Sequence, residues 1–147
     1  MTFPRVVGLG SHQGDDQAGW LVIDELEKLG YPRSRLLKIA HPVDLLDDIS
    51  PSSALVICDA CQGQGMGGTI HHWQWPTDSF IARHAGGTHD LPLPQVLDLA
   101  RQLARCPDRV DIWAIAGTSW SGASEPGPAV QTAARNLASK LWDRRHA

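Results

Sequence analysis

The sequence predicts an α/β fold: a three-layer sandwich in which helices cover both faces of a mainly parallel, twisted sheet. Two observations lead to this prediction. Short apolar runs rich in β-branched residues alternate along the chain with longer segments whose apolar residues recur at helical spacing. That alternation is typical of parallel sheets covered by helices. Because 147 residues suit one hydrophobic core, we expect a single domain over residues 1–147.

The N-terminal part of the chain is expected to alternate strictly between strands and helices. Gly30 ends the first helical pattern, and Pro42 suits the first turn of a second, shorter helix. The third apolar run has no polar interruption before Asp59, which is typical of a strand buried on both faces of a parallel sheet. The expected elements are strand 6–10, helix 16–29, strand 36–40, short helix 43–49 and strand 54–58.

The C-terminal part continues the alternation after a glycine-rich segment. Polar and aromatic residues alternate over 69–75 up to Pro76, which indicates an extended edge strand. A helical apolar pattern follows Pro94 and stops at Cys106-Pro107. The remaining expected elements are a buried strand over 110–116 and a helix over 129–142.

Composition excludes several classes of function. The net charge is -3, the isoelectric point is near 6.1, and the basic residues are scattered, so no nucleic-acid footprint is present. No apolar run reaches the ~20 residues of a membrane span, and the N-terminus lacks the pattern of an export signal. Three cysteines, an odd number, favour reduced thiols. We expect a cytoplasmic monomer with neither nucleic acid nor a membrane as a partner.

Three polar side chains are expected to meet at one edge of the sheet. Asp16 follows the first strand, Asp59 ends the third, and His89 lies in a loop that enters a helix. Ligands of such sheets bind outside the carboxyl ends of the strands. Two carboxylates and an imidazole suit a divalent transition metal. The simpler alternative is that Asp15 and Asp16 only cap the following helix, although a second adjacent carboxylate adds repulsion that capping does not require.

Four other motifs resemble known functional signatures, but each lacks a feature that the signature requires. Cys58-Asp59-Ala60-Cys61 has the spacing of a redox pair or zinc half-site, but no second cysteine pair exists. Gln13 stands where a dinucleotide fingerprint needs its third glycine, and Ser119 stands where a serine-hydrolase elbow at Ser121 needs glycine. His71 and His72 would point to opposite faces of an extended strand and so would not chelate together.

Five segments together resemble the nickel-iron hydrogenase maturation endopeptidases. The likeness covers nearly the whole chain, and the segments come in the family's order. They are Gly8-Leu9-Gly10-Ser11 through Asp15-Asp16 and Gly19, Ala40-His41-Pro42-Val43-Asp44-Leu45, Cys58-Asp59-Ala60, Thr88-His89-Asp90-Leu91-Pro92-Leu93, and Ser124-Glu125-Pro126-Gly127-Pro128-Ala129-Val130.

The resemblance implies an endopeptidase that removes the C-terminal extension of a hydrogenase large-subunit precursor. In the family this single cut follows nickel loading, so nickel would be supplied by the precursor and would permit cleavage. The implied metal ligands and catalytic residues are Asp16, Asp59 and His89, with the large-subunit precursor as partner. Two mechanisms stay open: the metal polarises the scissile carbonyl and acidifies a water, or it anchors the substrate while a carboxylate acts as general base.

The sequence departs from the family in its first motif. Ser11 stands where the family usually has Asn, and the stretch before the acids is one residue shorter. Asp16 is one methylene shorter than the family's glutamate, so His12 or Asp15 could contribute to the site instead. The alternative function is a non-catalytic nickel-binding checkpoint protein that docks on the precursor without cutting it.

Overall fold

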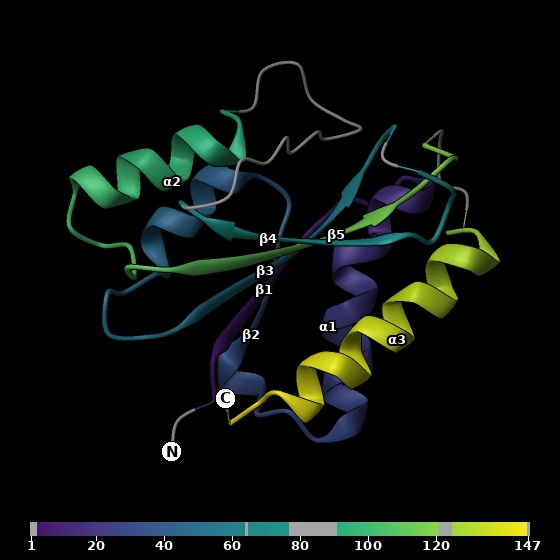
Figure 1. The fold of residues 1–147 in the computed structure, drawn as a ribbon, viewed down its shortest axis with the longest axis horizontal. Coiled ribbons are helices and arrows are strands. Elements are labelled where there is room, and N and C mark those ends of the chain that lie inside the picture. Colours follow the sequence, from purple (N-terminus) through teal and green to yellow (C-terminus); the bar gives the residue numbers. More distant parts are fainter. Residues whose placement is uncertain (1–2, 64, 77–90, 121–124, 147) are drawn as a thin grey trace.

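The predicted three-layer α/β fold is confirmed by the structure. A computed structural model describes residues 3–63, 65–76, 91–120 and 125–146. Its five-stranded sheet has the order β2-β1-β3-β5-β4 (Figure 1). The strands β2, β1, β3 and β5 are parallel to one another, and the edge strand β4 pairs antiparallel with β5. The strands are β1 (Arg5–Leu9), β2 (Leu36–Ile39), β3 (Leu55–Cys61), β4 (Ile70–Trp75) and β5 (Val110–Ala116).

The described residues form three α-helices and three short 3₁₀ helices. The α-helices are α1 (Ala18–Leu29), α2 (Leu93–Gln102) and α3 (Pro128–Asp143); the 3₁₀ helices are η1 (Gly14–Gln17), η2 (Arg33–Arg35) and η3 (Pro42–Asp47). Gly30 ends α1 in the left-handed region, at φ 100°, where a residue without Cβ is favoured. The first predicted helix is therefore divided, because residues 14–17 form a tighter turn before α1 begins.

The helices lie on both faces of the sheet, as Figure 1 shows. One core fills the space between the sheet and α1 and α3, and includes Val6, Val56 and Trp113. The second core lies under α2 and η3, and includes Val7 and Ile57. Because alternate residues of β1 and β3 enter opposite cores, both strands need apolar side chains on each face.

Two predicted boundaries were wrong in ways that matter for the site. β3 continues to Cys61, three residues beyond the predicted end, because its pairing with β5 extends to Ala116. Asp59 is thus inside the strand rather than after it. The second long helix begins at Leu93, before Pro94, since proline fits the first turn of a helix.

None of the helices in the described part of the chain is long and apolar enough to cross a membrane.

Candidate functional site

Close packing between α1 and the sheet positions the two predicted acidic residues. A Cβ on Gly19 would lie closer than 3.0 Å to backbone atoms of Leu9 and Cys58, so α1 approaches β1 and β3 more closely than any other residue would allow. Trp20 Nε1 also donates a hydrogen bond to the carbonyl of Ile39 at 3.0 Å, which ties α1 to the end of β2. The turn before α1 is therefore held against the carboxyl ends of β1, β2 and β3.

Asp16 and Asp59 are both buried at this edge, with exposed fractions of 6% and 3%. Asp59 Oδ1 accepts a hydrogen bond from the backbone N–H of Ala60 at 2.8 Å. Burial, and then repulsion from the Asp16 charge, raise the pKa of Asp59 well above its ordinary value of 3.8, against the opposing effect of that hydrogen bond. The structure thus brings together two of the three predicted site residues as an electrostatically coupled carboxylate pair.

Asp15 has a different role from Asp16. Its Oδ2 accepts hydrogen bonds from the backbone N–H groups of Thr118 at 2.8 Å and Ser119 at 3.0 Å, and its Oδ1 accepts one from Gly127 at 2.7 Å. Burial alone would raise the pKa of Asp15, but these three hydrogen bonds, together with one from the Thr118 side chain, outweigh burial and lower it. Asp15 therefore ties η1 to the connection between β5 and α3.

The structure corrects the capping interpretation for Asp15. No side-chain hydrogen bond caps α1 at its N-cap residue, Gln17. The backbone N–H groups that donate hydrogen bonds to Asp15 belong to a connection more than 100 residues later in the chain. One of them, Gly127, is the N-cap residue of α3. Sequence reasoning missed this role because a contact at such separation leaves no local pattern.

The third predicted ligand, His89, lies outside the described residues. His12 is exposed, and its ring lies edge-on against Trp20 with ring centroids 5.0 Å apart. Among residues 3–63, 65–76, 91–120 and 125–146, no three His, Cys, Asp or Glu side chains are grouped so that they could hold a metal ion. The alternative ligands His12 and Asp15 therefore do not complete a metal site with the carboxylate pair in the described structure.

Neither the cysteine pair nor the histidine pair forms a chelating unit. Cys58 belongs to the core under α1 and α3, whereas Cys61 packs with Ala114 and Ala116 in a separate cluster. The two thiols thus lie on opposite faces of β3. His72 stacks on Trp113 with ring centroids 3.9 Å apart, while His71 stacks on Trp73, which confirms that these histidines also face opposite ways.

Several solved structures with the same architecture are hydrogenase maturation proteases. The endopeptidase HybD from E. coli superposes with a TM-score of 0.74 at 18% identity, over 98% of this chain and 91% of its own. The chain has the hydrogenase maturation endopeptidase fold. The [NiFe] hydrogenase maturation protease HycI from Thermococcus kodakarensis KOD1 gives a TM-score of 0.68 at 20% identity, over 94% of this chain and 88% of its own.

A further structure with the maturation endopeptidase fold, HycI from Escherichia coli, gives a TM-score of 0.69 at 19% identity, over 97% of this chain and 92% of its own. No protein-family model and no curated protein sequence matches the chain. At identities of this size the likeness establishes the fold, and the chemistry has to be argued from the site itself.

Proposed function

We propose that the protein is an endopeptidase that removes the C-terminal extension of a nickel-loaded hydrogenase large-subunit precursor. The observation that carries the proposal is the buried, coupled pair Asp16 and Asp59 at the carboxyl edge of the sheet. In parallel α/β sheets this edge is where ligands bind. The fold shared with proteins named as hydrogenase maturation endopeptidases directs the choice of substrate.

The carboxylate pair fits the task of receiving a nickel ion carried by the precursor. Two buried groups of like charge repel one another, and a divalent cation between them would remove that repulsion. Carboxylate oxygens together with an imidazole form a donor set of the kind that divalent first-row metals accept. In this proposal Asp16 and Asp59 supply the oxygens, and His89, assigned through the family resemblance, supplies the nitrogen.

Cleavage of the peptide bond also needs a group that takes up the proton of the attacking water. A carboxylate does this efficiently near neutral pH only when its pKa is raised. Burial and the neighbouring Asp16 raise the pKa of Asp59 in the metal-free protein, and a nickel ion bound to Asp59 would remove this shift. Asp59 therefore serves either as a nickel ligand or as the general base. In the general-base mechanism, nickel is the feature of the substrate that brings the scissile bond to this carboxylate.

The test is incubation of the purified protein with nickel-loaded and nickel-free precursor, followed by intact-mass measurement of the large subunit. The proposal predicts loss of one defined C-terminal peptide from the nickel-loaded form alone. A stable complex with no change in mass would instead identify a checkpoint protein that docks without cutting. Equal cleavage of both forms would remove nickel from the recognition step.

A further inference from the structure

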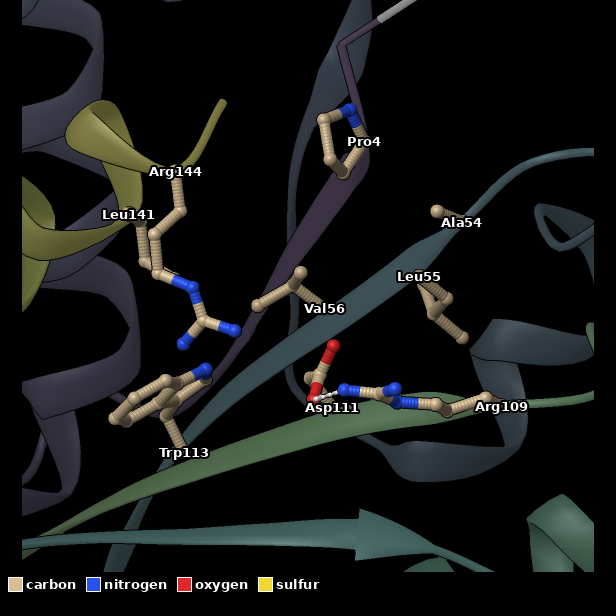
Figure 2. A pocket seen from close by; sticks show the side chains of 9 residues that line it. All are labelled: Pro4, Ala54, Leu55, Val56, Arg109, Asp111, Trp113, Leu141 and Arg144. Atoms are coloured by element: carbon tan, nitrogen blue, oxygen red, sulfur yellow. Dashed lines mark ion pairs between the residues drawn. The ribbon is translucent and has the colours of Figure 1, made fainter. Parts of the chain in front are cut away.

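A hollow opens at the opposite end of the sheet from the carboxylate pair. It lies between the amino ends of β3 and β5 and the last turn of α3, and its volume is about 280 Å³ (Figure 2). Val56 lines it on the face covered by α1 and α3, whereas Asp59, three residues later, points to the other face. Along β3 the two places are about 10 Å apart. This hollow is therefore separate from the candidate site.

Its walls combine aliphatic surface with charged groups. Pro4, Leu55, Val56 and Leu141 contribute the apolar part of the lining. Arg109, Asp111 and Arg144 contribute the charged part. A lining of this kind, mostly apolar with a few polar groups that converge, is typical of small-molecule sites, although the volume is near the lower limit of about 300 Å³ for such sites.

The acidic group of the hollow already has its partners. Asp111 Oδ1 lies 2.8 Å from His72 Nε2 and 3.6 Å from Arg109 Nη2. The dashed line in Figure 2 marks the pairing with Arg109. Asp111 therefore holds Arg109 at the rim of the hollow.

Arg144 has no ion-pair partner among the described residues. Its guanidinium reaches from α3 over Trp113 toward Val56 (Figure 2), 5.6 Å from the centroid of the Trp113 ring. A guanidinium held over an aromatic face keeps its charge and its planar set of donors.

The apolar part of a ligand has to lie against the aliphatic wall, because the Trp113 ring is already covered. His72 stacks on Trp113 at 3.9 Å between centroids, Lys140 Nζ lies 5.4 Å from the ring centroid, and Trp113 is only 5% exposed. Lys140 adds a second positive charge beside that of Arg144, so the field in the hollow favours an anion.

We propose that this hollow is a second binding site, which takes a small carboxylate with an apolar body. The carboxylate pairs with the guanidinium of Arg144, a planar group suited to two parallel hydrogen bonds. Arg109 faces the same anion from the rim. The body of the ligand packs against Val56 and Leu141. This inference does not rest on the proposed peptidase activity.

Benzoate is the probe, and benzyl alcohol is the matched uncharged control. Each is titrated into the full-length ¹⁵N-labelled protein while amide chemical shifts are recorded. Benzoate is expected to shift the amides of Val56, Trp113 and Arg144 saturably, and benzyl alcohol is expected to leave them unchanged. Added salt weakens benzoate binding, because the anion is held by exposed charge.

Two variants and one control locate the site. Arg144→Gln is expected to weaken benzoate binding about tenfold, the size expected for the loss of a charge-assisted hydrogen bond. Arg135→Gln, on the same helix but exposed and away from the hollow, is expected to bind as the wild type does. Arg109→Gln, at the exposed rim, keeps the test available if Arg144→Gln does not fold, and is expected to weaken binding about threefold.

Several results would overturn the inference. One is the absence of saturable shifts at the hollow with benzoate, and another is equal binding of benzyl alcohol. A third is an affinity for benzoate that Arg144→Gln and Arg109→Gln leave at the level of Arg135→Gln.

Discussion

Removal of the Asp15 carboxylate is the most informative structural perturbation. Asp15 is 1% exposed and accepts three backbone hydrogen bonds at 2.7 to 3.0 Å. Asp15→Ala removes both acceptor oxygens, and with them three hydrogen bonds, and leaves the amides of Thr118, Ser119 and Gly127 without these partners. These amides belong to the connection between β5 and α3, beside the candidate site. The substitution should therefore make this connection less ordered as well as destabilise the fold.

The expected cost follows from the number and type of the lost bonds. A hydrogen bond to a charged acceptor contributes about 1.5–3 kcal/mol. The three bonds share one carboxylate, and Thr118 and Ser119 are exposed, so water can replace part of what is lost. We therefore expect about 1 kcal/mol for each bond and about 3 kcal/mol in all. This is a large share of the ~5–15 kcal/mol that stabilises a typical domain.

Urea unfolding followed by circular dichroism measures this loss. Asp47→Ala is the matched control, because Asp47 is exposed, and it should change the free energy of unfolding by less than about 0.5 kcal/mol. The pKa of Asp15 is lowered in the folded state, so its contribution is present above the ordinary pKa of 3.8 and is lost as the pH falls through the folded value. The difference between wild type and Asp15→Ala should therefore shrink in acid. Equal free energies of unfolding for Asp15→Ala and Asp47→Ala at pH 7 would show that the hydrogen bonds of Asp15 do not stabilise the fold.

Three further predictions concern the site and its surroundings. Asp59→Asn should abolish processing yet raise the melting temperature at pH 7. The pKa of Asp59 is raised in the folded state, so the ionised side chain opposes folding above its ordinary pKa. A lower melting temperature of Asp59→Asn would contradict this. Gly19→Ala, which in an open helix would stabilise by about 1 kcal/mol, should destabilise because its Cβ meets strand backbone, and urea unfolding gives the sign. In a thiol-reagent assay of the native protein, half-buried Cys106 should react before Cys58 and Cys61, because those two thiols are buried. Burial also raises the pKa of Cys61 to about 11. Early reaction of Cys61 would contradict its burial in the core.

The order of the elements could be predicted because each strand and helix has its own local pattern. The run over 110–116 is apolar except at Asp111, and β5 has those bounds. Asp111 breaks the pattern at the place where it pairs with His72. Ends were predicted less well where pairing with a neighbour, rather than local propensity, decides them, as at Cys61.

The candidate site was predictable in part for a related reason. Asp16 and Asp59 each adjoin the carboxyl end of a parallel strand, and topology alone brings such positions to one edge. Asp16 was predicted for the site, but the role of Asp15 could not be predicted, because Asp15 accepts hydrogen bonds from amides more than 100 residues later in the chain. The close approach at Gly19 was equally hidden, since it depends on how near α1 lies to Leu9 and Cys58.

In the proposed function, the Asp16–Asp59 pair cleaves a nickel-loaded hydrogenase precursor. The most direct measurement is the intact mass of that precursor after incubation with wild type or with Asp59→Asn, the fold of each being checked by circular dichroism. Wild type is expected to remove a defined C-terminal peptide, and folded Asp59→Asn is expected to leave the precursor at full length. Trimming by Asp59→Asn at the wild-type rate, or no trimming by wild type, would contradict the proposed function.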